Sequence, residues 1–338
     1  MKLLINPAGG MAGDMFAAAL VSAGADFNIM QNAMQAAGNK LGTAQIHINQ
    51  TPDGSSQLFI KLDSQRRHLG EFEAKEILRQ LFDEFSIRDP YREFGMNTLD
   101  ILAKAEKRAH AEYHIVIEDD HSHSHEPSHH HHPHSHDHHH DHDHNHNHDH
   151  SHNNHHHSPG SAPLDPHNHA HTHIHDHPDT PSQPHSHPHS HAHTHEHPEG
   201  EQAFLHEAQD IVIDIMGAVT GLQQLDIEPN AVLLHPVSVG GGQIHFSHGT
   251  HSIPAPATTV ILEEHRIPWK KGPIEKELFT PTGAALLAAL GAKLDETIRL
   301  ESLETTARGK ARGTKILDIP PLELFIYRAD RGSKNSSR

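Results

Sequence analysis

A block of histidines in the middle of the chain most limits what this sequence can fold into. Thirty-four of the 44 histidines lie between His121 and His197, where they alternate with Asp, Ser, Asn and Pro and with very few apolar residues. A segment without apolar side chains cannot form a hydrophobic core, so we expect residues 116–200 to be a disordered insert. The insert separates two parts of one globular domain, residues 1–115 and 201–330, and a flexible tail follows at 331–338.

The composition of this block is typical of metal binding. Imidazole is a common ligand of late divalent metals, and interspersed aspartates add oxygen donors. The chain has no cysteine, which excludes thiolate cages and leaves Ni, Co, Zn and Cu(II) open. The alternative is a low-complexity linker without a metal role. The predicted ligands in the block are His121, His123, His125, His129, His130, His131, His132, His134, His136, His138, His139, His140, His142, His144, His146, His148 and His150.

Charge and hydropathy narrow the class of protein. The formal net charge of -18, with histidine counted as neutral, argues against nucleic-acid binding, which requires a basic face. The sequence contains no apolar run long enough to span a membrane, and no export signal follows Met1. We therefore expect a cytoplasmic protein that binds neither nucleic acid nor membrane.

The apolar pattern outside the block predicts mixed secondary structure. Helices are expected from about residue 14 and near 27–37, 71–83, 97–112, 206–225, 258–264 and 280–290. Strands are expected at 3–5, 231–239, 243–247, 296–303 and 322–328, with a hairpin formed by 45–50 and 57–62. Helices and strands that do not alternate strictly predict an α/β or α+β domain with a mixed sheet.

Two glycine-containing turns precede predicted helices and could bind a ligand. Residues 9–15 read GGMAGDM, between a strand and a helix, where backbone N–H groups bind anions. The pattern matches neither a dinucleotide fingerprint nor a P-loop. Asp14 could act on a ligand or simply cap its own helix. The second turn reads TPTG, and the candidate cofactor-binding residues of the two turns are Gly10, Gly13, Thr280, Thr282 and Gly283.

A third candidate site opens the helix predicted at 206–225. His206, Asp210 and Asp214 follow one another at i+4 spacing, which places them on one helix face, and Glu207 adjoins them. Such a face can hold a metal ion or act on a bound ligand, or it can be a solvated acidic helix start. The two aspartates lie in an apolar run, DIVIDIMGAV, which favours the functional interpretation. With Asp14, these four residues form the candidate catalytic set.

Two isolated histidines outside the block are further candidate ligands. His68 follows two arginines, and His110 ends a charged helix. Each could equally be an ordinary surface or helix-terminal histidine. The candidate metal ligands outside the block are thus His68, His110 and His206.

Several segments in order resemble the LarC family of nickel insertion proteins. They read GGMAGDM, RRHLGE, KAEKRAH, FLHEAQDIVIDIMGA, HGTHSIPAPAT and IEKELFTPTGAALLAAL, and the resemblance covers residues 3 to about 318. It implies insertion of Ni²⁺ into a pyridinium-3,5-bisthiocarboxylic acid mononucleotide, with nickel–carbon and nickel–sulfur bonds, to make the nickel-pincer cofactor. It also implies a lyase or chelatase that consumes CTP with Mg²⁺ or Mn²⁺.

The chain departs from the family pattern in three places. The interval between Glu207 and Asp210 is two residues shorter, Asn6 to Ala8 replace a turn that contains Cys or Ser, and the CTP-binding domain would follow Arg338. We therefore expect a separate C-terminal polypeptide as a partner for insertion. The alternative is a non-catalytic protein that stores or delivers nickel or another divalent metal. A GTP-driven nickel chaperone would need a P-loop, which the sequence lacks.

Overall fold

The structure is a computed structural model, and it describes residues 1–64, 68–113, 204–205, 210–246 and 249–328. Its main sheet has seven strands in the order β11-β6-β1-β13-β12-β3-β2. Strands β1 and β6 are parallel, as are β6 and β11 and β12 and β3, whereas the other neighbours are antiparallel. The strands of this sheet are β1 (Lys2–Asn6), β2 (Thr43–Gln50), β3 (Ser56–Asp63), β6 (Ala231–Leu233), β11 (Lys293–Leu294), β12 (Thr305–Ala311) and β13 (Leu322–Tyr327).

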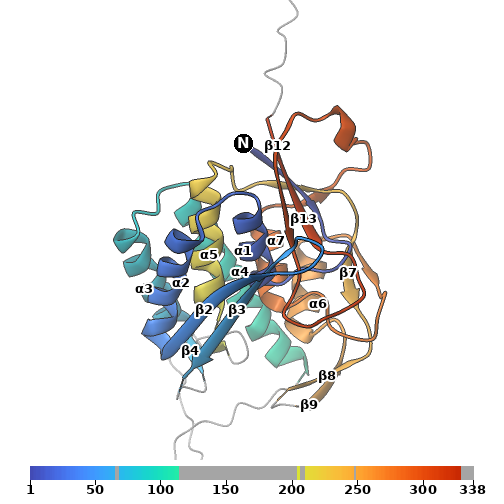
Figure 1. The fold of residues 1–338 in the computed structure, drawn as a ribbon. Coiled ribbons are helices and arrows are strands. Elements are labelled where there is room, and N and C mark those ends of the chain that lie inside the picture. The colour runs from blue at the N-terminus through green and yellow to red at the C-terminus, as the bar shows by residue number, and fades with distance from the viewer. Residues whose placement is uncertain (65–67, 114–203, 206–209, 247–248, 329–338) are drawn as a thin grey trace, which may run out of the picture. The chain divides into compact units, whose positions relative to one another are not determined.

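Helices lie in a layer beside this sheet (Figure 1). Helix α1 packs on β3, β12 and β13, helix α2 packs on β2, and α5 packs on both helices. The helices of the described residues are α1 (Gly13–Ser22), α2 (Phe27–Leu41), α3 (Glu71–Glu84), α4 (Tyr91–Tyr113), α5 (Ile211–Gln224), α6 (Pro256–Glu264) and α7 (Pro281–Ala289), with a 3₁₀ turn at Leu300–Ser302. The prediction of a mixed sheet with helices is confirmed.

A glycine allows helices α2 and α5 to approach each other closely. Gly217 on α5 leaves room for the Met34 side chain of α2, and a Cβ atom at this position would lie 2.9 Å from the Met34 sulfur. The apolar run DIVIDIMGAV is therefore buried on all sides, as residues Ile211 to Leu222 of α5 show. A helix buried on all sides has no solvated face on which a charge can rest.

Smaller pairs of strands complete the fold. They are β4 (Leu69–Gly70) with β5 (Phe204–Leu205), β7 (Val237–Gly240) with β10 (Trp269–Lys271), and β8 (Gln243–Phe246) with β9 (Gly249–Ser252). Within the described ranges, no helix is both long and apolar enough to cross a membrane.

Most predicted elements are present, but several predictions were wrong in detail. The strand expected at 231–239 is two strands, β6 and β7, because Pro236 lacks an N–H group and interrupts the ladder. The strand expected at 296–303 is a bend and a 3₁₀ turn, and the strand lies instead at Thr305–Ala311. Helix α4 starts at Tyr91, directly after Pro90, rather than near residue 97.

The helix expected at 206–225 begins at Ile211 in the structure. Residues 206–209 lie outside the described residues, so the placement of His206 and Glu207 stays a prediction. The histidine block also lies outside the described residues. The residues before and after it share the main sheet, since β1 pairs with both β6 and β13.

Candidate functional site

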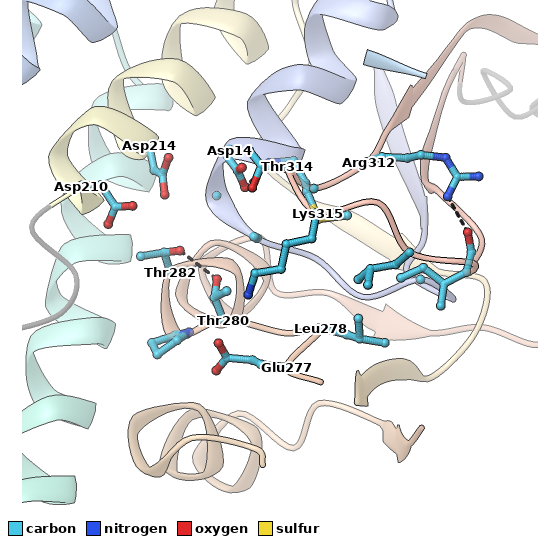
Figure 2. Close-up of a pocket in the computed structure, with 18 of the residues that line it drawn as sticks. Asp14, Asp210, Asp214, Glu277, Leu278, Thr280, Thr282, Arg312, Thr314 and Lys315 are labelled. Carbon is cyan, nitrogen blue, oxygen red and sulfur yellow. Dashed lines mark hydrogen bonds between the residues drawn. The ribbon is translucent and has the colours of Figure 1, made fainter. Parts of the chain in front are cut away.

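A cavity of about 360 Å³ lies where the first turns of α1, α5 and α7 meet the connection between β12 and β13. Both apolar side chains, such as Leu278, and polar side chains line it. Figure 2 shows the polar groups directed into this space. The ionisable and hydroxyl side chains of the wall are Asp14, Glu106, Asp210, Asp214, Glu277, Thr280, Thr282, Arg312, Thr314 and Lys315.

Backbone hydrogen bonds hold the starts of α1 and α7 together. The Met11 N–H donates to the Leu278 carbonyl at 2.8 Å, and the Thr280 N–H donates to the Met11 carbonyl at 3.3 Å. Gly10 has a φ of 86°, and a Cβ atom there would lie 2.0 Å from the Leu278 carbonyl oxygen, so a larger residue would separate the two segments. The two glycine turns predicted from the sequence therefore form one wall of the cavity.

Asp214 is the most deeply buried carboxylate of the site. Its residue is 2% exposed, and its Oδ1 atom has no hydrogen-bond partner among the described residues. The carboxylate lies against the backbone of Gly13, where a Cβ atom would be 1.9 Å from Oδ2. A buried carboxylate oxygen without a partner costs free energy unless a bound proton, a water molecule or a ligand satisfies it.

Three carboxylates near the α1 and α5 starts influence one another. Burial raises the pKa of Asp14 to about 6, against a hydrogen bond from the Met15 N–H, and the charge of Asp210 adds to the rise. Burial raises the pKa of Asp210 to about 6. Burial and the charges of Asp210 and Asp14 raise the pKa of Asp214 well above its usual value. We refer to Asp14, Asp210 and Asp214 as the carboxylate cluster.

A chain of hydroxyl groups connects α7 to the cluster. The Thr282 hydroxyl stabilises the charged form of the Asp214 carboxylate and so lowers its pKa, against the larger effect of burial. Thr282 and Thr280 share a 3.0 Å hydrogen bond, drawn as a dashed line in Figure 2, and the Gly283 N–H donates to Thr280 Oγ1 at 3.2 Å. Thr280 is thus the helix N-cap predicted from the sequence. These hydroxyl groups therefore lie on the α7 side of the carboxylate cluster, whereas Asp214 Oδ1 has no hydrogen-bond partner among the described residues.

The connection between β12 and β13 forms the opposite wall. Arg312 donates to Asp53 at 2.9 Å and to the Ile319 carbonyl at 2.5 Å, and the Gln57 side chain donates to the Gly313 carbonyl at 2.7 Å. These bonds anchor the segment that carries Lys315. In Figure 2 the Lys315 side chain extends into the cavity, on the side of Thr280.

The structure brings together part of the predicted site. Asp14, Asp210 and Asp214 line the cavity together with Gly13, Thr280 and Thr282. Gly10 and Gly283 do not line it, but they pack against the backbone of Leu278 and Met11, which connects the two turns. His110 lies 3.9 Å from Glu106, which reaches the cavity, and both side chains are 14% exposed. His68 precedes β4 and is not part of the cavity wall.

The described residues do not form a ready-made metal site. Within them, no three His, Asp or Glu side chains are placed together so that they could hold a metal ion. The carboxylate cluster is therefore close enough for mutual electrostatic effects, but it is not arranged as a ligand set.

Sequence reasoning missed four charged residues of the cavity, Glu106, Glu277, Arg312 and Lys315. Glu106 lies within the segment KAEKRAH, in which the sequence analysis selected only His110 as a candidate ligand. Lys315 lies in the segment RGKARGTK, whose basic residues and glycines were the available signal. These residues are distant in sequence from the carboxylates of the cavity, so their proximity becomes evident only in the folded structure.

Comparison with known proteins identifies the family. The sequence profile of the family described as nickel insertion protein matches residues 3–129 and 187–336. A nickel insertion protein of Methanothrix thermoacetophila is 48% identical over 91 residues, or 26% of this chain and 23% of the relative. One of Gloeobacter violaceus is 36% identical over 132 residues, or 38% of this chain and 30% of the relative.

A third relative has a more specific name. The pyridinium-3,5-bisthiocarboxylic acid mononucleotide nickel insertion protein of Staphylococcus saprophyticus is 37% identical over 122 residues, or 36% of this chain and 29% of the relative. The chain thus spans less than a third of the length of these curated relatives. No solved structure matches the chain. The family profile covers most of the sequence on both sides of the histidine block, and the chain belongs to the nickel insertion protein family.

Proposed function

We propose that the carboxylate cluster receives Ni²⁺ and passes it to a pyridinium mononucleotide bound in the cavity. The observation that carries this proposal is the buried Oδ1 atom of Asp214, which lacks a hydrogen-bond partner among the described residues. A divalent cation would satisfy it and would remove the repulsion within the cluster. The name of the staphylococcal relative supplies the acceptor, pyridinium-3,5-bisthiocarboxylic acid mononucleotide.

The chemistry of the ligands gives the transfer a direction. Nickel is held more tightly by sulfur and nitrogen donors than by carboxylate oxygens alone. An ion on the carboxylate cluster would therefore move readily to an acceptor that carries two thiocarboxylate groups. The cluster would act as a weak intermediate site, from which the metal can leave.

The raised pKa values suit a second role for the cluster. A nickel–carbon bond, which the family resemblance implies, replaces a C–H bond of the acceptor ring and so releases a proton. A carboxylate whose pKa is about 6, as for Asp14 and Asp210, is mostly ionised at neutral pH and is a suitable proton acceptor. We assign proton acceptance to these two residues and metal contact to Asp214.

The histidine block would collect the metal. Its 34 imidazoles can bind several ions, and the chain continues from the block through His206 and Glu207 to Asp210. In this proposal His206 and Glu207 transfer Ni²⁺ from the block to the cluster. His68 and His110 would be additional ligands along the way.

Four further assignments belong to the same proposal. CTP with Mg²⁺ or Mn²⁺ would serve as co-substrate through a separate C-terminal polypeptide, and the reaction would be of the lyase or chelatase class. The acceptor would be the small-molecule partner, and the protein would act in the cytoplasm. The alternative proposal, a protein that only stores or delivers nickel, requires the histidine block alone.

One deletion distinguishes insertion from storage. A variant without residues 121–197 is compared with the full chain in a host that contains the rest of the cofactor pathway, over a series of Ni²⁺ concentrations. Insertion by the cavity predicts that cofactor formation falls at low Ni²⁺ and returns at saturating Ni²⁺, because the block only raises the local metal concentration. Storage predicts that the contribution of this chain to cofactor formation stays lost in the deletion variant, even at saturating Ni²⁺.

A substitution in the full chain completes the test. Asp214→Asn keeps the histidine block and removes the buried charge, so insertion predicts loss of cofactor formation at every Ni²⁺ concentration. Cofactor formation at the wild-type rate by this variant would contradict the assignment of the cavity.

A further inference from the structure

The proposed acceptor poses an electrostatic problem for the cavity. A mononucleotide carries a phosphate group, whereas the cluster of Asp14, Asp210 and Asp214 concentrates negative charge at the starts of α1 and α5. Like charges at close range in a partly buried site repel strongly. The phosphate must therefore lie away from the cluster, at a part of the cavity that offers positive charge.

Of the residues that the structure describes, two with cationic side chains line the cavity, and one of these two has no partner within the protein. Arg312 is engaged with Asp53 and with the Ile319 carbonyl. Lys315 forms no hydrogen bond or ion pair within the described ranges, although several carboxylates line the same cavity. Its ammonium group can therefore bind a ligand without first breaking an ion pair.

Hydrogen bonds hold the residues on either side of Lys315, namely Arg312 and Gly313 before it and Ile319 after it. Arg312 and Gln57 hold the backbone of the β12–β13 connection from both sides. Figure 2 shows the side chain entering the cavity near the start of α7. The N-terminal end of a helix carries partial positive charge, which adds to the attraction for an anion at this place.

We propose that Lys315 binds the phosphate of a mononucleotide whose ring end faces the carboxylate cluster. This inference rests on the function proposed above. It gives the cavity two ends, one that takes the metal cation and one that takes the phosphate, and so sets the orientation of the acceptor. The residue is a specificity-determining residue, because it would favour a nucleotide over its nucleoside.

Calorimetric titration of the full chain with three probes tests the inference. The probes are nicotinic acid mononucleotide, which is a pyridinium mononucleotide, its dephosphorylated riboside, and CTP. The wild-type protein should bind the mononucleotide about ten- to a hundredfold more tightly than the riboside, as expected for a charge-assisted hydrogen bond. Lys315→Met should abolish this preference, and Lys315→Arg should retain most of it.

Lys270→Met is the matched control, because Lys270 is an exposed residue of β10 outside the cavity wall. It should bind all three probes as the wild type does. Lys315 is itself exposed and makes few contacts, so its substitution should leave the thermal unfolding midpoint unchanged.

The possible failures are distinguishable. If the wild type prefers the mononucleotide and Lys315→Met keeps that preference, the assignment of Lys315 is wrong and the proposed function stands. If Lys315→Met weakens only CTP binding, the lysine serves a triphosphate and the inference is wrong. If the wild type binds neither the mononucleotide nor the riboside, with or without Ni²⁺, the proposed function fails and this inference fails with it.

Discussion

The carboxylate cluster and the Asp53–Arg312 ion pair show opposite uses of charge around one cavity. Asp53 lies beside a guanidinium group, whose hydrogen bonds hold the pKa of that carboxyl well below its usual range. Asp14, Asp210 and Asp214 have no such cation among the described residues; burial raises the pKa of all three, and neighbouring carboxylates add to the rise for Asp14 and Asp214. The ion pair stabilises the fold, whereas the cluster destabilises it in the absence of a ligand.

The difference separates a carboxylate that is paired within the protein from the three to which we assign a function. A charge that is matched within the protein needs nothing from outside. A buried charge without a partner is retained only if something else depends on it, and binding or catalysis is the usual reason. Substitutions in the two regions should therefore change stability in opposite directions.

The largest expected effect is the loss of nickel transfer in Asp214→Asn. The amide keeps the shape of the side chain but removes the charge that would hold the metal. We expect the initial rate of cofactor formation, measured with Ni²⁺ in excess, to fall about a hundredfold. Asp295→Asn is the matched control, because Asp295 is a partly exposed aspartate outside the cavity wall, where it accepts a hydrogen bond from the Thr297 N–H. A normal rate in Asp214→Asn would remove the distinction between the two regions.

The second prediction tests how tightly Asp214 is held. Gly13→Ala would place a methyl group 1.9 Å from Asp214 Oδ2 and should destabilise the protein by about 1 to 3 kcal/mol, measured from urea unfolding. Gly313→Ala, whose Cβ would be 3.6 Å from the nearest atom, should change little. The double variant Gly13→Ala/Asp214→Ala should recover much of the loss. Additive effects would show that the glycine and the carboxylate are not in contact.

The third prediction concerns the pH dependence of stability. A raised pKa means that the folded state binds the proton more tightly than the unfolded chain does, so stability falls as pH rises from about 3.8 through the folded pKa values, which are about 6 for Asp14 and Asp210. At neutral pH, metal-free Asp214→Asn should be more stable than the wild type by about 1 to 3 kcal/mol.

Thermal unfolding of both proteins from pH 4 to pH 8 checks this. The stability advantage of Asp214→Asn should be small at pH 4 and should grow toward pH 8. An advantage that shrinks as pH rises would have the wrong sign and would contradict the raised pKa. Saturating Ni²⁺ should reduce the advantage, because the metal binds only the wild-type cluster well.

The smallest change in stability is expected when the ion pair between Asp53 and Arg312 is removed. Asp53→Asn should lower stability by less than about 1 kcal/mol, because the Asp53 and Arg312 side chains are 41% and 26% exposed and solvent screens their attraction. The measurement is the unfolding midpoint at low and at high salt, and the difference from wild type should shrink in high salt. A stabilising effect of Asp53→Asn would reverse the comparison from which these predictions start.

Much of the candidate site follows from local sequence. The Thr280 N-cap, the i+4 spacing of Asp210 and Asp214, and the turn before α1 depend on neighbours within a few residues, and the structure contains all three. The unusual placement of two aspartates in an apolar helix also marks them in the sequence. Short-range patterns of this kind determine local structure without knowledge of the fold.

The remaining features depend on contacts that the sequence alone does not reveal. Strand β12 reads TTARGKA and has few apolar residues, so its place beside β13 in the sheet arises from backbone pairing rather than from hydrophobic pattern. Lys315 follows that strand and reaches the cavity only because the strand lies there. The convergence of Asp14 with Asp214 similarly requires α1 to pack on α5.

The position of β1 has a consequence for how the chain is made. This first strand lies between β6 and β13, which begin at residues 231 and 322, so its partners leave the ribosome only after the entire histidine block has emerged. Until then its two edges are unpaired and exposed to other chains or chaperones. Contacts over such long separations in sequence are formed slowly, and synthesis that stops before residue 322 would leave β1 with an open edge.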